Sequence, residues 1–496
     1  MQLPPAPLTG NFSSVLDIFD EVIRVASHHE AFVQPSLNGP TRRLSFVDWA
    51  TQADALAGWL HERGVRKGDV VGLQLPSGID YAIAYQAIVR AGAIATGINS
   101  RLGPSEISHI IARCEPVYVF DGALPQCDGG DPLRRRVAIE STDPMAIVWT
   151  GGTTGFPKGA WFDHACLEAM SHGAAPLSVV GDRRLSPLPF AHIGAMTRVW
   201  DELMHFITTV IVPSPWTAAG ALSAIHSERV SVSQGVPTQY RMMFDHPDFA
   251  TTDTSHLRIA GIGAARIPPE LVMEMQEKLK CPVVVRYAST EGCIATGTRL
   301  DDDIETICTT VGRPNGGVKI RIVASDGSEC APNEVGTVQL HSRARMRGYW
   351  KDPELTTQSI ASDDWLITGD LGRIDAVGNL HLAGRSTEMY IRGGYNVYPI
   401  EIENVLGTYS DILSAAIVGA SVSDRLGEIG VLFAVARPGT TLELSAIRSF
   451  VRASLADYKA PDILVVVAEL PLTSLGKVDK KQLQPTADQE AAQWSR

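Results

Sequence analysis

The segment Thr150-Gly-Gly-Thr-Thr-Gly-Phe-Pro-Lys-Gly159 directly follows the apolar run Met145-Ala-Ile-Val-Trp149, and this junction is the most informative feature of the sequence. The apolar run is typical of a buried strand, and the glycines and threonines behind it predict a mobile loop. Glycines let backbone N–H groups approach an anion closely, threonine hydroxyls add donors, and Lys158 supplies a positive charge. The loop differs from a Walker loop, because no Gly-Lys-Ser/Thr follows the glycines and Pro157 precedes the lysine. From the residues alone, it fits either phosphate binding or a flexible surface hairpin.

Further motifs follow in the second half of the chain. They are Trp365-Leu-Ile-Thr-Gly-Asp370, Leu371-Gly-Arg-Ile-Asp375, Gly378-Asn-Leu-His-Leu-Ala-Gly-Arg385, Arg392-Gly-Gly-Tyr-Asn-Val-Tyr-Pro399, Glu401-Ile-Glu403 and Leu470-Pro-Leu-Thr-Ser-Leu-Gly-Lys477. Together with the glycine-rich loop, they resemble the motifs of the adenylate-forming superfamily, which includes acyl-CoA synthetases, carrier-protein adenylation domains and firefly-type luciferases. The matching segments keep the family's order from about residue 15 to about residue 485. The chain is therefore identified as a member of that superfamily.

Composition restricts the class of protein further. With 496 residues, the chain is longer than one hydrophobic core usually supports, so we expect at least two domains. A net charge of −12 argues against nucleic acid as a partner, whereas ATP and CoA bind through local positive groups. The seven cysteines never form a CxxC pair, which favours a reducing compartment. The N-terminal residues lack the features of a signal peptide and no apolar run reaches membrane-spanning length, so we expect a cytoplasmic protein without a membrane span.

Alternating helical and strand patterns in the first third predict a layered α/β body. The expected helices are 45–61, 80–91 and 104–112, and the expected strands are 69–75, 93–97, 116–120 and 145–149. We also expect an exposed connection over 121–136, hairpin turns at Gly372 and Gly378, and a frayed polar tail over 484–496.

The domain boundary is expected after Gly384. Residues 1–384 would form a large layered α/β domain with a small β-barrel-like subdomain, holding the ATP and acyl pockets. Residues 385–496 would form a small α+β cap that, by the resemblance, rotates between two reaction steps and carries the catalytic lysine. At the hinge the family usually has Asp or Lys, whereas Thr387 stands here, so the balance between the two orientations could differ.

The resemblance assigns nucleotide-binding roles to two groups of residues. In Tyr287-Ala-Ser-Thr-Glu-Gly292, the tyrosine packs on adenine, Thr290 reaches phosphate and Glu291 holds Mg²⁺. Asp370 accepts from the ribose hydroxyls, and Arg385 contacts the ribose near the hinge. The full expected ATP and AMP set is Thr150, Gly151, Gly152, Thr153, Thr154, Gly155, Lys158, Gly263, Ala264, Ala265, Arg286, Tyr287, Ala288, Ser289, Asp370, Leu382 and Arg385.

Three residues are expected to carry the chemistry: Lys477, Glu291 and Thr290. Joining a carboxylate to ATP brings two anions together, so the reaction needs cations and positioned donors. By the resemblance, the ammonium of Lys477 bridges the carboxylate and the α-phosphate. From composition alone, the run Lys477-Val-Asp-Lys-Lys481 would be only a solvated basic segment.

The acyl pocket is expected at His192, Trp200, Val236, Gly263, Arg286 and Ala288. Ala288 replaces the usual glycine, so its methyl group should narrow the pocket slightly. An arginine at position 286 resembles that of malonate ligases, where it can pair with a second carboxylate, but ligases for larger acids can also carry it. The pantetheine arm of CoA is expected at Arg392, Gly393, Gly394 and Tyr395. His164 is interpreted as structural.

The resemblance favours an AMP-forming acyl-CoA ligase that uses ATP, Mg²⁺ and CoA with a small carboxylic acid. The alternatives are a ligase that loads a carrier protein, a non-catalytic binding protein on the same fold, and a luciferase-like oxygenase. Fatty, aromatic, alicyclic, steroid-derived and dicarboxylic acids all stay open at this point. Similar enzymes are commonly dimers, so a homodimer is compatible with the resemblance.

Overall fold

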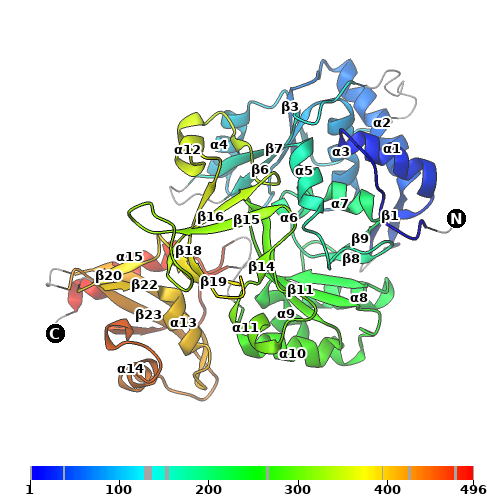
Figure 1. The fold of residues 1–496 in the computed structure, drawn as a ribbon. Coiled ribbons are helices and arrows are strands. Elements are labelled where there is room, and N and C mark those ends of the chain that lie inside the picture. Colours follow the sequence, from blue (N-terminus) through cyan, green and yellow to red (C-terminus); the bar gives the residue numbers. More distant parts are fainter. Residues whose placement is uncertain are drawn as a thin grey trace. The chain divides into compact units, whose positions relative to one another are not determined.

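The computed structural model describes residues 3–36, 39–127, 137–150, 156–263, 267–393, 395–422, 426–473 and 477–494. It has the predicted α/β fold, with several sheets and many helices (Figure 1). The chain divides into two compact units, Met1–Ile320 with Leu340–Ile367, and Arg321–Gln339 with Thr368–Arg496. The main part of the second unit therefore begins at Thr368, before residue 385, and the unit also includes the internal segment Arg321–Gln339. The functional domain boundary after Gly384 stays a prediction.

A nine-stranded sheet forms the centre of the first unit. In spatial order its strands are β14 (Arg313–Pro314), β13 (Cys293–Gly297), β12 (Val283–Ser289), β11 (Ile259–Gly263), β10 (Val232–Gly235), β8 (Arg183–Ser186), β9 (Thr208–Ile211), β1 (Glu30–Gln34) and β2 (Arg42–Ser45). The strands from β12 to β1 pair in parallel, and β13, β14 and β2 add antiparallel edges. Strands β11 and β12 are largely apolar, as expected of parallel strands covered on both faces, whereas β8 and β10 also carry polar or charged residues.

A second, six-stranded sheet belongs to the same unit. Its order is β17 (Gly348–Tyr349), β7 (Lys158–Asp163), β6 (Pro144–Thr150), β4 (Ile94–Gly97), β3 (Val70–Gln74) and β5 (Tyr118–Asp121). Strands β3 to β6 confirm the four strands expected in this part of the sequence. β6 and β7 pair antiparallel with Thr150 opposite Lys158, so they form the two sides of the glycine-rich loop.

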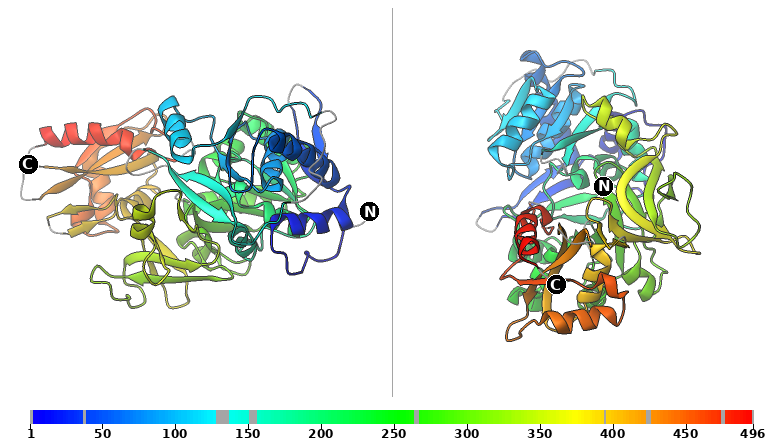
Figure 2. Two further views of the ribbon diagram at one scale, coloured as in Figure 1. Left: turned by 90° about the horizontal axis from the view of Figure 1, so that it is seen from above. Right: turned by 90° about the vertical axis from the view of Figure 1, so that its left-hand side faces the viewer.

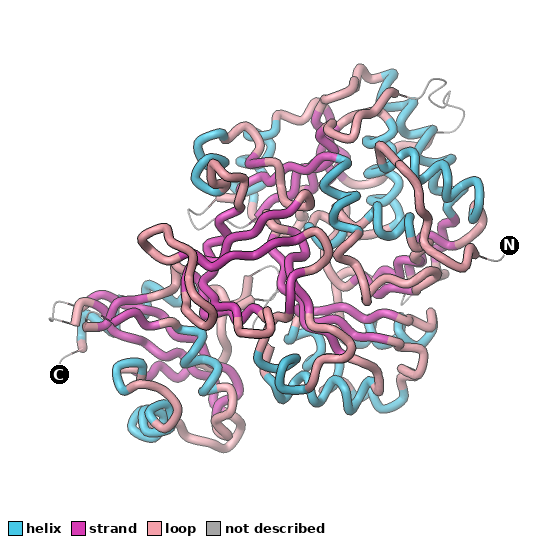
Figure 3. Tube along the Cα trace, viewed as in Figure 1, coloured by secondary structure: helices cyan, strands magenta, loops and turns pink. Residues whose placement is uncertain are grey.

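Helices and strands alternate along the first unit (Figure 3). The helical segments are α1 (Val15–Ala26), α2 (Phe46–Glu62), α3 (Ile79–Arg90), α4 (Pro104–Cys114), α5 (His164–Ser171), α6 (Ile193–Met196), α7 (Val199–Met204), α8 (Ala218–Ser227), α9 (Pro237–Phe244), the 3₁₀ turn η1 (Pro247–Thr251), α10 (Pro269–Leu279), α11 (Ile304–Thr309) and α12 (Pro353–Ser359). The start of α2 follows from its cap, because the Ser45 side chain accepts from the backbone N–H of Asp48. The expected helix over 80–91 stops before Gly92, which has a positive φ of 71°.

The remaining strands and helices lie wholly or partly in the second unit. The strands are β15 (Val318–Val323), β16 (Gly336–Ser342), β18 (Leu366–Ile374), β19 (Leu380–Arg385), β20 (Tyr390–Arg392), β21 (Tyr395–Val397), β22 (Ile412–Ser421), β23 (Glu428–Ala436) and β24 (Ile463–Val466). The helices are α13 (Pro399–Leu406), α14 (Leu444–Arg452), the 3₁₀ turn η2 (Asp457–Lys459) and α15 (Lys480–Gln493). Strands β15, β16, β18 and β19 form one sheet, β20 and β21 a second, and β22 to β24 a third.

Two sequence-based expectations are wrong. The C-terminal tail is not frayed over its length, because 480–493 form α15, which lies along β22 (Figure 2). Leu483, Ala487 and Ala491 recur every fourth residue and are buried, giving this polar helix one packing face. Gly372 is no turn either: it lies inside β18 at a register shift, where a Cβ atom would come within 2.7 Å of the His381 carbonyl oxygen. The turn of this hairpin contains Gly378, as expected.

Among the described residues, no helix is long and apolar enough to cross a membrane. The expected exposed connection falls partly on 128–136, and those positions lie outside the described residues.

Candidate active site

A largely apolar cavity lies in the first unit, where the parallel strands β8, β10 and β11 end. Ligands commonly bind at the carboxyl ends of parallel strands, because loops that leave neighbouring strands there form a crevice. Its walls include Phe190 from the segment before α6, Ile193 at the start of α6, and Val236 from the turn before α9. The cavity is thus assembled from segments that are distant in sequence and adjacent in the sheet.

Five of the six residues expected at the acyl pocket line this cavity, namely His192, Val236, Gly263, Arg286 and Ala288. Ser289, expected in the nucleotide set, lines it too. His192 caps α6, and its Nδ1 accepts from the backbone N–H of Gly194 at 3.2 Å. Trp200, the sixth expected residue, is 3% exposed and does not line the cavity.

Gly263 is required where the cavity meets the sheet. It ends β11 and lies opposite Arg286 on β12. A Cβ atom at this position would lie 2.5 Å from the carbonyl oxygen of Arg286, far inside van der Waals contact. The positions that follow, Ala264 and Ala265, lie outside the described residues.

The guanidinium group of Arg286 is held by the protein. Its Nη1 donates to the Gly173 carbonyl at 3.0 Å and to Asn315 Oδ1 at 3.1 Å. Its Nη2 donates to the carbonyls of Ala174 and Ala175. Burial, together with the charge of Arg198, lowers the Arg286 pKa to about 10. These contacts anchor the segment around Ala174, which lines the cavity, and they disfavour the interpretation that Arg286 serves a second substrate carboxylate.

The turn between β12 and β13 carries the expected metal ligand. The turn is closed by the backbone N–H of Gly292, which donates to Ser289 Oγ at 2.9 Å. Within it, Glu291 Oε1 accepts a 2.8 Å hydrogen bond from the Tyr349 hydroxyl. The ammonium of Lys158 lies 5.9 Å from the centre of the Tyr349 ring. Thr290, in the same turn, is partly buried.

This arrangement fits Mg²⁺ bound together with phosphate. Mg²⁺ is commonly held by one or two carboxylates and by substrate phosphates, with water completing its octahedron. The Tyr349 hydroxyl fixes one oxygen of Glu291, which leaves the other as the donor that a cation would use. Within the described part of the chain, no group of three or more His, Cys, Asp or Glu side chains could hold a metal alone. A metal here would therefore depend on the nucleotide.

Two of the expected nucleotide residues flank the glycine-rich loop. Thr150 ends β6, opposite Lys158 at the start of β7. The intervening positions Gly151, Gly152, Thr153, Thr154 and Gly155 lie outside the described residues. Tyr287 is 7% exposed and, unlike its strand neighbours Arg286 and Ala288, does not line the cavity. This difference follows from the alternation of side chains along a strand.

In the second unit, the hairpin of β18 and β19 brings Asp370 and Arg385 together. They lie directly opposite each other, with Arg385 Nε 3.0 Å from Asp370 Oδ1. Asp370 is 6% exposed, whereas the Arg385 side chain is half exposed. Leu382 lies on the same hairpin and is partly buried, and Thr387 is exposed in the turn that follows.

Lys477 lies at the end of a closed loop. The Thr473 backbone N–H donates to the Lys477 carbonyl at 2.7 Å, and the Lys477 N–H donates to Thr473 Oγ1 at 3.2 Å. Leu472 and Val478 form a bridge at the base of this loop. The side chain of Lys477 is exposed, so the loop fixes the backbone and leaves the ammonium at the surface of its unit.

The expected CoA segment contains one fixed ion pair and one aromatic pair. Arg392 donates from Nε and Nη2 to the two oxygens of Asp462, at 2.9 and 2.7 Å. Asp462 thereby raises the Arg392 pKa, and the bidentate pair holds β20 in place. Tyr395 is 58% exposed and stacks on Tyr458, with ring centres 4.5 Å apart. Gly393 is exposed with a φ of 59°, and Gly394 lies outside the described residues.

Sequence reasoning missed Tyr349 and a set of buried charges at the cavity. Tyr349 meets Glu291 only because β17 joins the six-stranded sheet, and nothing in Gly348-Tyr349-Trp350 signals that contact. The buried charges include Arg184 and Glu202, both of which line the cavity. The sequence signal that could have indicated these charges is the pair Arg183-Arg184 in the short strand β8.

Comparison with known proteins agrees with this geometry. Residues 19–350 match the family described as AMP-binding enzyme, and residues 401–477 match the AMP-binding enzyme C-terminal domain. The chain belongs to the AMP-binding enzyme family. It is therefore an adenylate-forming enzyme, as the motifs predict.

The relatives are similar over nearly their whole lengths. A CoA ligase of Mycobacterium tuberculosis, named for a methyl-dioxo-octahydroindenyl propanoyl group, is 33% identical over 96% of this chain and 99% of its own. The indoleacetate–CoA ligase of Aromatoleum aromaticum is 30% identical, covering 89% of this chain and 92% of its own. The ATP-bound crystal structure of MatB from Rhodopseudomonas palustris has a TM-score of 0.87 and 26% identity, covering 95% of this chain and 99% of its own. ATP binding is supported by the family and by that structure.

Proposed function

We propose that this AMP-binding enzyme is an acyl-CoA ligase. It would convert a carboxylic acid and ATP to acyl-AMP and pyrophosphate, and then transfer the acyl group to the thiol of CoA with release of AMP. The observation that carries the proposal is the course of strand β12. Ala288 and Ser289 line the apolar cavity, and the next turn carries Glu291 under the hydroxyl of Tyr349. A cavity for an acyl body thus adjoins a carboxylate suited to a magnesium–phosphate group.

The relatives support CoA as the acceptor. The M. tuberculosis and A. aromaticum relatives are both named CoA ligases, and both match at least 89% of this chain. Their acids, an oxidised fused-ring propanoate and indoleacetate, are bulky ring-containing acids. A cavity with predominantly apolar walls is compatible with an acid of that general kind.

In the first half-reaction, each of these residues would have a distinct chemical role. Glu291 would hold Mg²⁺, which supplies positive charge to the phosphates when bound. Thr290 and Lys158 would donate to phosphate oxygens, and Asp370 would accept from the ribose hydroxyls. Lys477 would offset the repulsion between the carboxylate and the α-phosphate during attack, so its removal should slow the chemical step more than substrate binding.

The second half-reaction requires a thiol to reach the acyl-adenylate. We assign Gly393 and Tyr395 to the pantetheine segment, because both are exposed. Arg392 would act mainly by holding β20 through Asp462. Thr387 would be the hinge position of the C-terminal domain.

The two half-reactions can be measured separately by omitting or adding CoA. Purified protein should release pyrophosphate from ATP in the presence of a suitable ring-containing acid, and should form AMP and acyl-CoA when CoA is added. Acyl-AMP that accumulates while CoA is ignored would contradict CoA as the acceptor and indicate a carrier protein. Failure to form acyl-AMP with any acid in a broad panel would contradict the ligase proposal.

A further inference from the structure

The apolar cavity contains a charged region on one wall. It is lined by Arg184 of β8 and Thr209 of β9. Glu202 of α7 and Arg198, which directly precedes that helix, also line it. Arg184 and Arg198 are 4% and 5% exposed, so their charges lie in the interior. Buried arginines are costly unless they are paired, and their presence beside an apolar pocket calls for a specific use.

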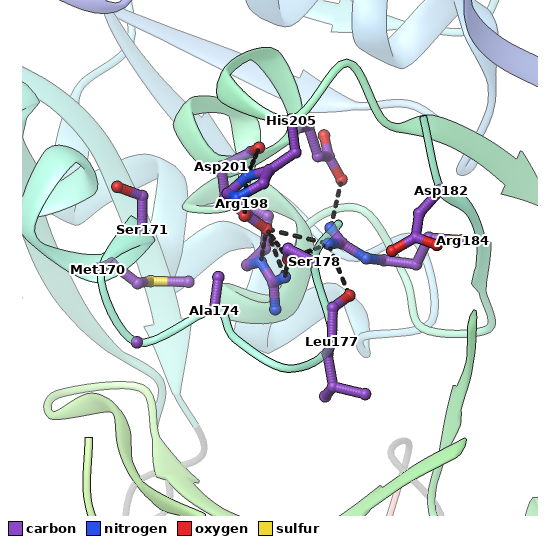
Figure 4. A network of polar contacts seen from close by, with 12 residues as sticks. Met170, Ser171, Ala174, Leu177, Ser178, Asp182, Arg184, Arg198, Asp201 and His205 are labelled. Carbon is purple, nitrogen blue, oxygen red and sulfur yellow. Dashed lines mark hydrogen bonds and ion pairs between the residues drawn. The ribbon is translucent and has the colours of Figure 1, made fainter. Parts of the chain in front are cut away.

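The two arginines converge on one carboxylate, Asp201, and on Ser178 (Figure 4). Arg198 donates to Asp201 Oδ2 from Nε at 3.1 Å and from Nη2 at 2.5 Å. Arg184 uses only Nη2, which donates to Leu177 O at 3.2 Å, to Ser178 Oγ at 2.5 Å and to Asp201 Oδ2 at 3.1 Å. Leu177 lines the cavity, whereas Asp201 and Ser178 do not, so two of the three acceptors of Nη2 lie outside the cavity lining.

The other nitrogens of Arg184 are left without a hydrogen-bond acceptor among the described residues. Both Nε and Nη1 are buried and unsatisfied. The nearby carboxylate oxygen, Glu202 Oε1, lies 3.7 Å from Nη1, beyond hydrogen-bond distance, and accepts instead from Thr209 Oγ1 at 3.2 Å. A buried donor without a partner costs more than a satisfied one, so an acceptor that enters the cavity would be bound strongly.

The charges around Arg184 favour a neutral acceptor. The guanidinium groups of Arg184 and Arg198 face the carboxylates of Asp201 and Glu202, so two positive groups meet two negative ones. His205 lies against Asp201, with Nδ1 3.0 Å from Oδ1. A second substrate carboxylate would bring another negative charge beside Glu202, whereas a carbonyl oxygen would accept from Nη1 without that repulsion.

The position of Arg184 determines which end of the acid would lie beside its guanidinium group. Going across the sheet from β12, where the cavity adjoins the proposed nucleotide residues, β8 is the third strand. With strands 4.7–4.9 Å apart, the backbones of β12 and β8 are separated by roughly 14 Å. An acid whose carboxylate lies near β12 would therefore present its remote end, beyond a ring-sized apolar body, to Arg184.

We infer that the cavity selects a bulky apolar carboxylic acid that carries a ketone oxygen at the end remote from its carboxylate, with Nη1 of Arg184 as the donor. The inference rests on the proposed ligase function and names its substrate class. Arg184 is a specificity-determining residue in this account and takes no part in adenylation itself. Only an acceptor satisfies it, because a guanidinium group carries donors alone.

The test compares two acids that differ only in the ketone. One is a bicyclic alkylpropanoic acid with a ring ketone far from the carboxylate, and the other has CH₂ at that position. The wild-type protein should release pyrophosphate with a kcat/KM roughly 10- to 100-fold higher for the keto acid. A third acid, with a carboxylate in place of the ketone, should be a poorer substrate than the keto acid.

Two variants locate the effect at Arg184. Arg184→Lys keeps the positive charge, and the three donors of an ammonium match the three acceptors that Nη2 now serves. It should fold and lose the keto preference, measured as the ratio of kcat/KM for the keto and CH₂ acids. The matched control is Ser178→Ala, which removes a contact of the same guanidinium outside the cavity and should keep the keto preference.

The outcomes separate the two proposals. Equal turnover of the keto and CH₂ acids by the wild-type protein, or an unchanged preference in Arg184→Lys, would overturn this inference and leave the ligase intact. A preference for the dicarboxylic acid would likewise overturn it, in favour of anion recognition. No pyrophosphate release with any acid would overturn the ligase proposal and this inference with it.

Discussion

His164 should make the stability of the protein depend on pH between about 6.5 and about 4. It begins α5, is 2% exposed, and its Nδ1 accepts a 3.2 Å hydrogen bond from the backbone N–H of Val15. Burial is the largest cause that lowers its pKa, from 6.5 to about 4. The native protein therefore holds this imidazole neutral, as the structural interpretation of His164 predicts.

The sign and size of the effect follow from proton binding. Below pH 6.5 the unfolded chain binds a proton at His164, whereas the native chain binds it only near pH 4. Acid therefore favours unfolding. The stability is fully present above pH 6.5 and is lost as the pH falls toward 4. The difference between a pKa of 6.5 and one of about 4 corresponds to about 3.4 kcal/mol, of which about 2 kcal/mol is lost between pH 7 and pH 5.

The assay is the midpoint of urea unfolding measured at pH 7, 6 and 5 for wild type and for His164→Asn. The Asn side chain can offer an acceptor to Val15 without titrating, so the difference in stability between the two proteins should shrink as the pH falls. His28→Asn, at an exposed position, is the matched control and should follow the wild-type curve. Parallel curves for wild type and His164→Asn across this range would refute the reasoning.

Three further predictions concern backbone packing, the metal ligand and a pair of salt bridges. Gly263→Ala should lower kcat/KM for adenylation by roughly 10- to 100-fold, measured by pyrophosphate release. The added Cβ would lie 2.5 Å from the Arg286 carbonyl oxygen, so the strand must shift and displace the cavity wall. Tyr349→Phe should raise the Mg²⁺ concentration needed for half-maximal adenylation by about tenfold, because Glu291 loses its orienting hydroxyl. Lys480→Met should destabilise the second unit by about 2 kcal/mol in urea unfolding, because Glu388 and Glu403 lose the ammonium they share at 2.8 and 2.9 Å.

Each of these has its own control and contrary result. Gly261→Ala meets only the flexible side chains of Leu177 and Gln234, so it should be milder than Gly263→Ala, and equal effects would contradict the packing argument. An unchanged Mg²⁺ requirement in Tyr349→Phe would show that the hydroxyl does not position the carboxylate. Lys481→Met, at the exposed neighbour of Lys480, should leave unfolding unchanged, and a loss equal to that of Lys480→Met would argue against the buried ion pairs.

The parts of the fold that depend on local pattern were predictable. The helix after Ser45, the helix before Gly92 and the apolar strands β6 and β12 follow from caps, glycines and runs of buried side chains within a few residues. The C-terminal helix was missed because its packing face consists of a leucine and two alanines, which carry a weak hydrophobic signal in a polar segment. Burial against β22 decides that helix, and β22 lies about sixty residues earlier.

The cavity was predictable only in outline. Motifs indicated His192, Val236 and Ala288, whose place beside the strand ends follows from the family's order of elements. The use of Arg286 was not predictable, because its acceptors are carbonyl groups of a segment more than a hundred residues away. The same holds for Arg184, whose unsatisfied nitrogens become apparent only when its contacts from three segments are known.

The most direct test of the account is mass-spectrometric product analysis with ATP, Mg²⁺ and a panel of ring-containing and fatty acids, with and without CoA. We expect AMP and an acyl-CoA that form only when CoA is present, and near-complete loss of adenylation in Lys477→Ala with the fold retained. A Lys477→Ala protein that forms acyl-AMP at the wild-type rate would contradict the role of that lysine. A wild-type protein that forms no acyl-AMP with any acid, or forms it and never transfers the acyl group to CoA, would contradict the central claim.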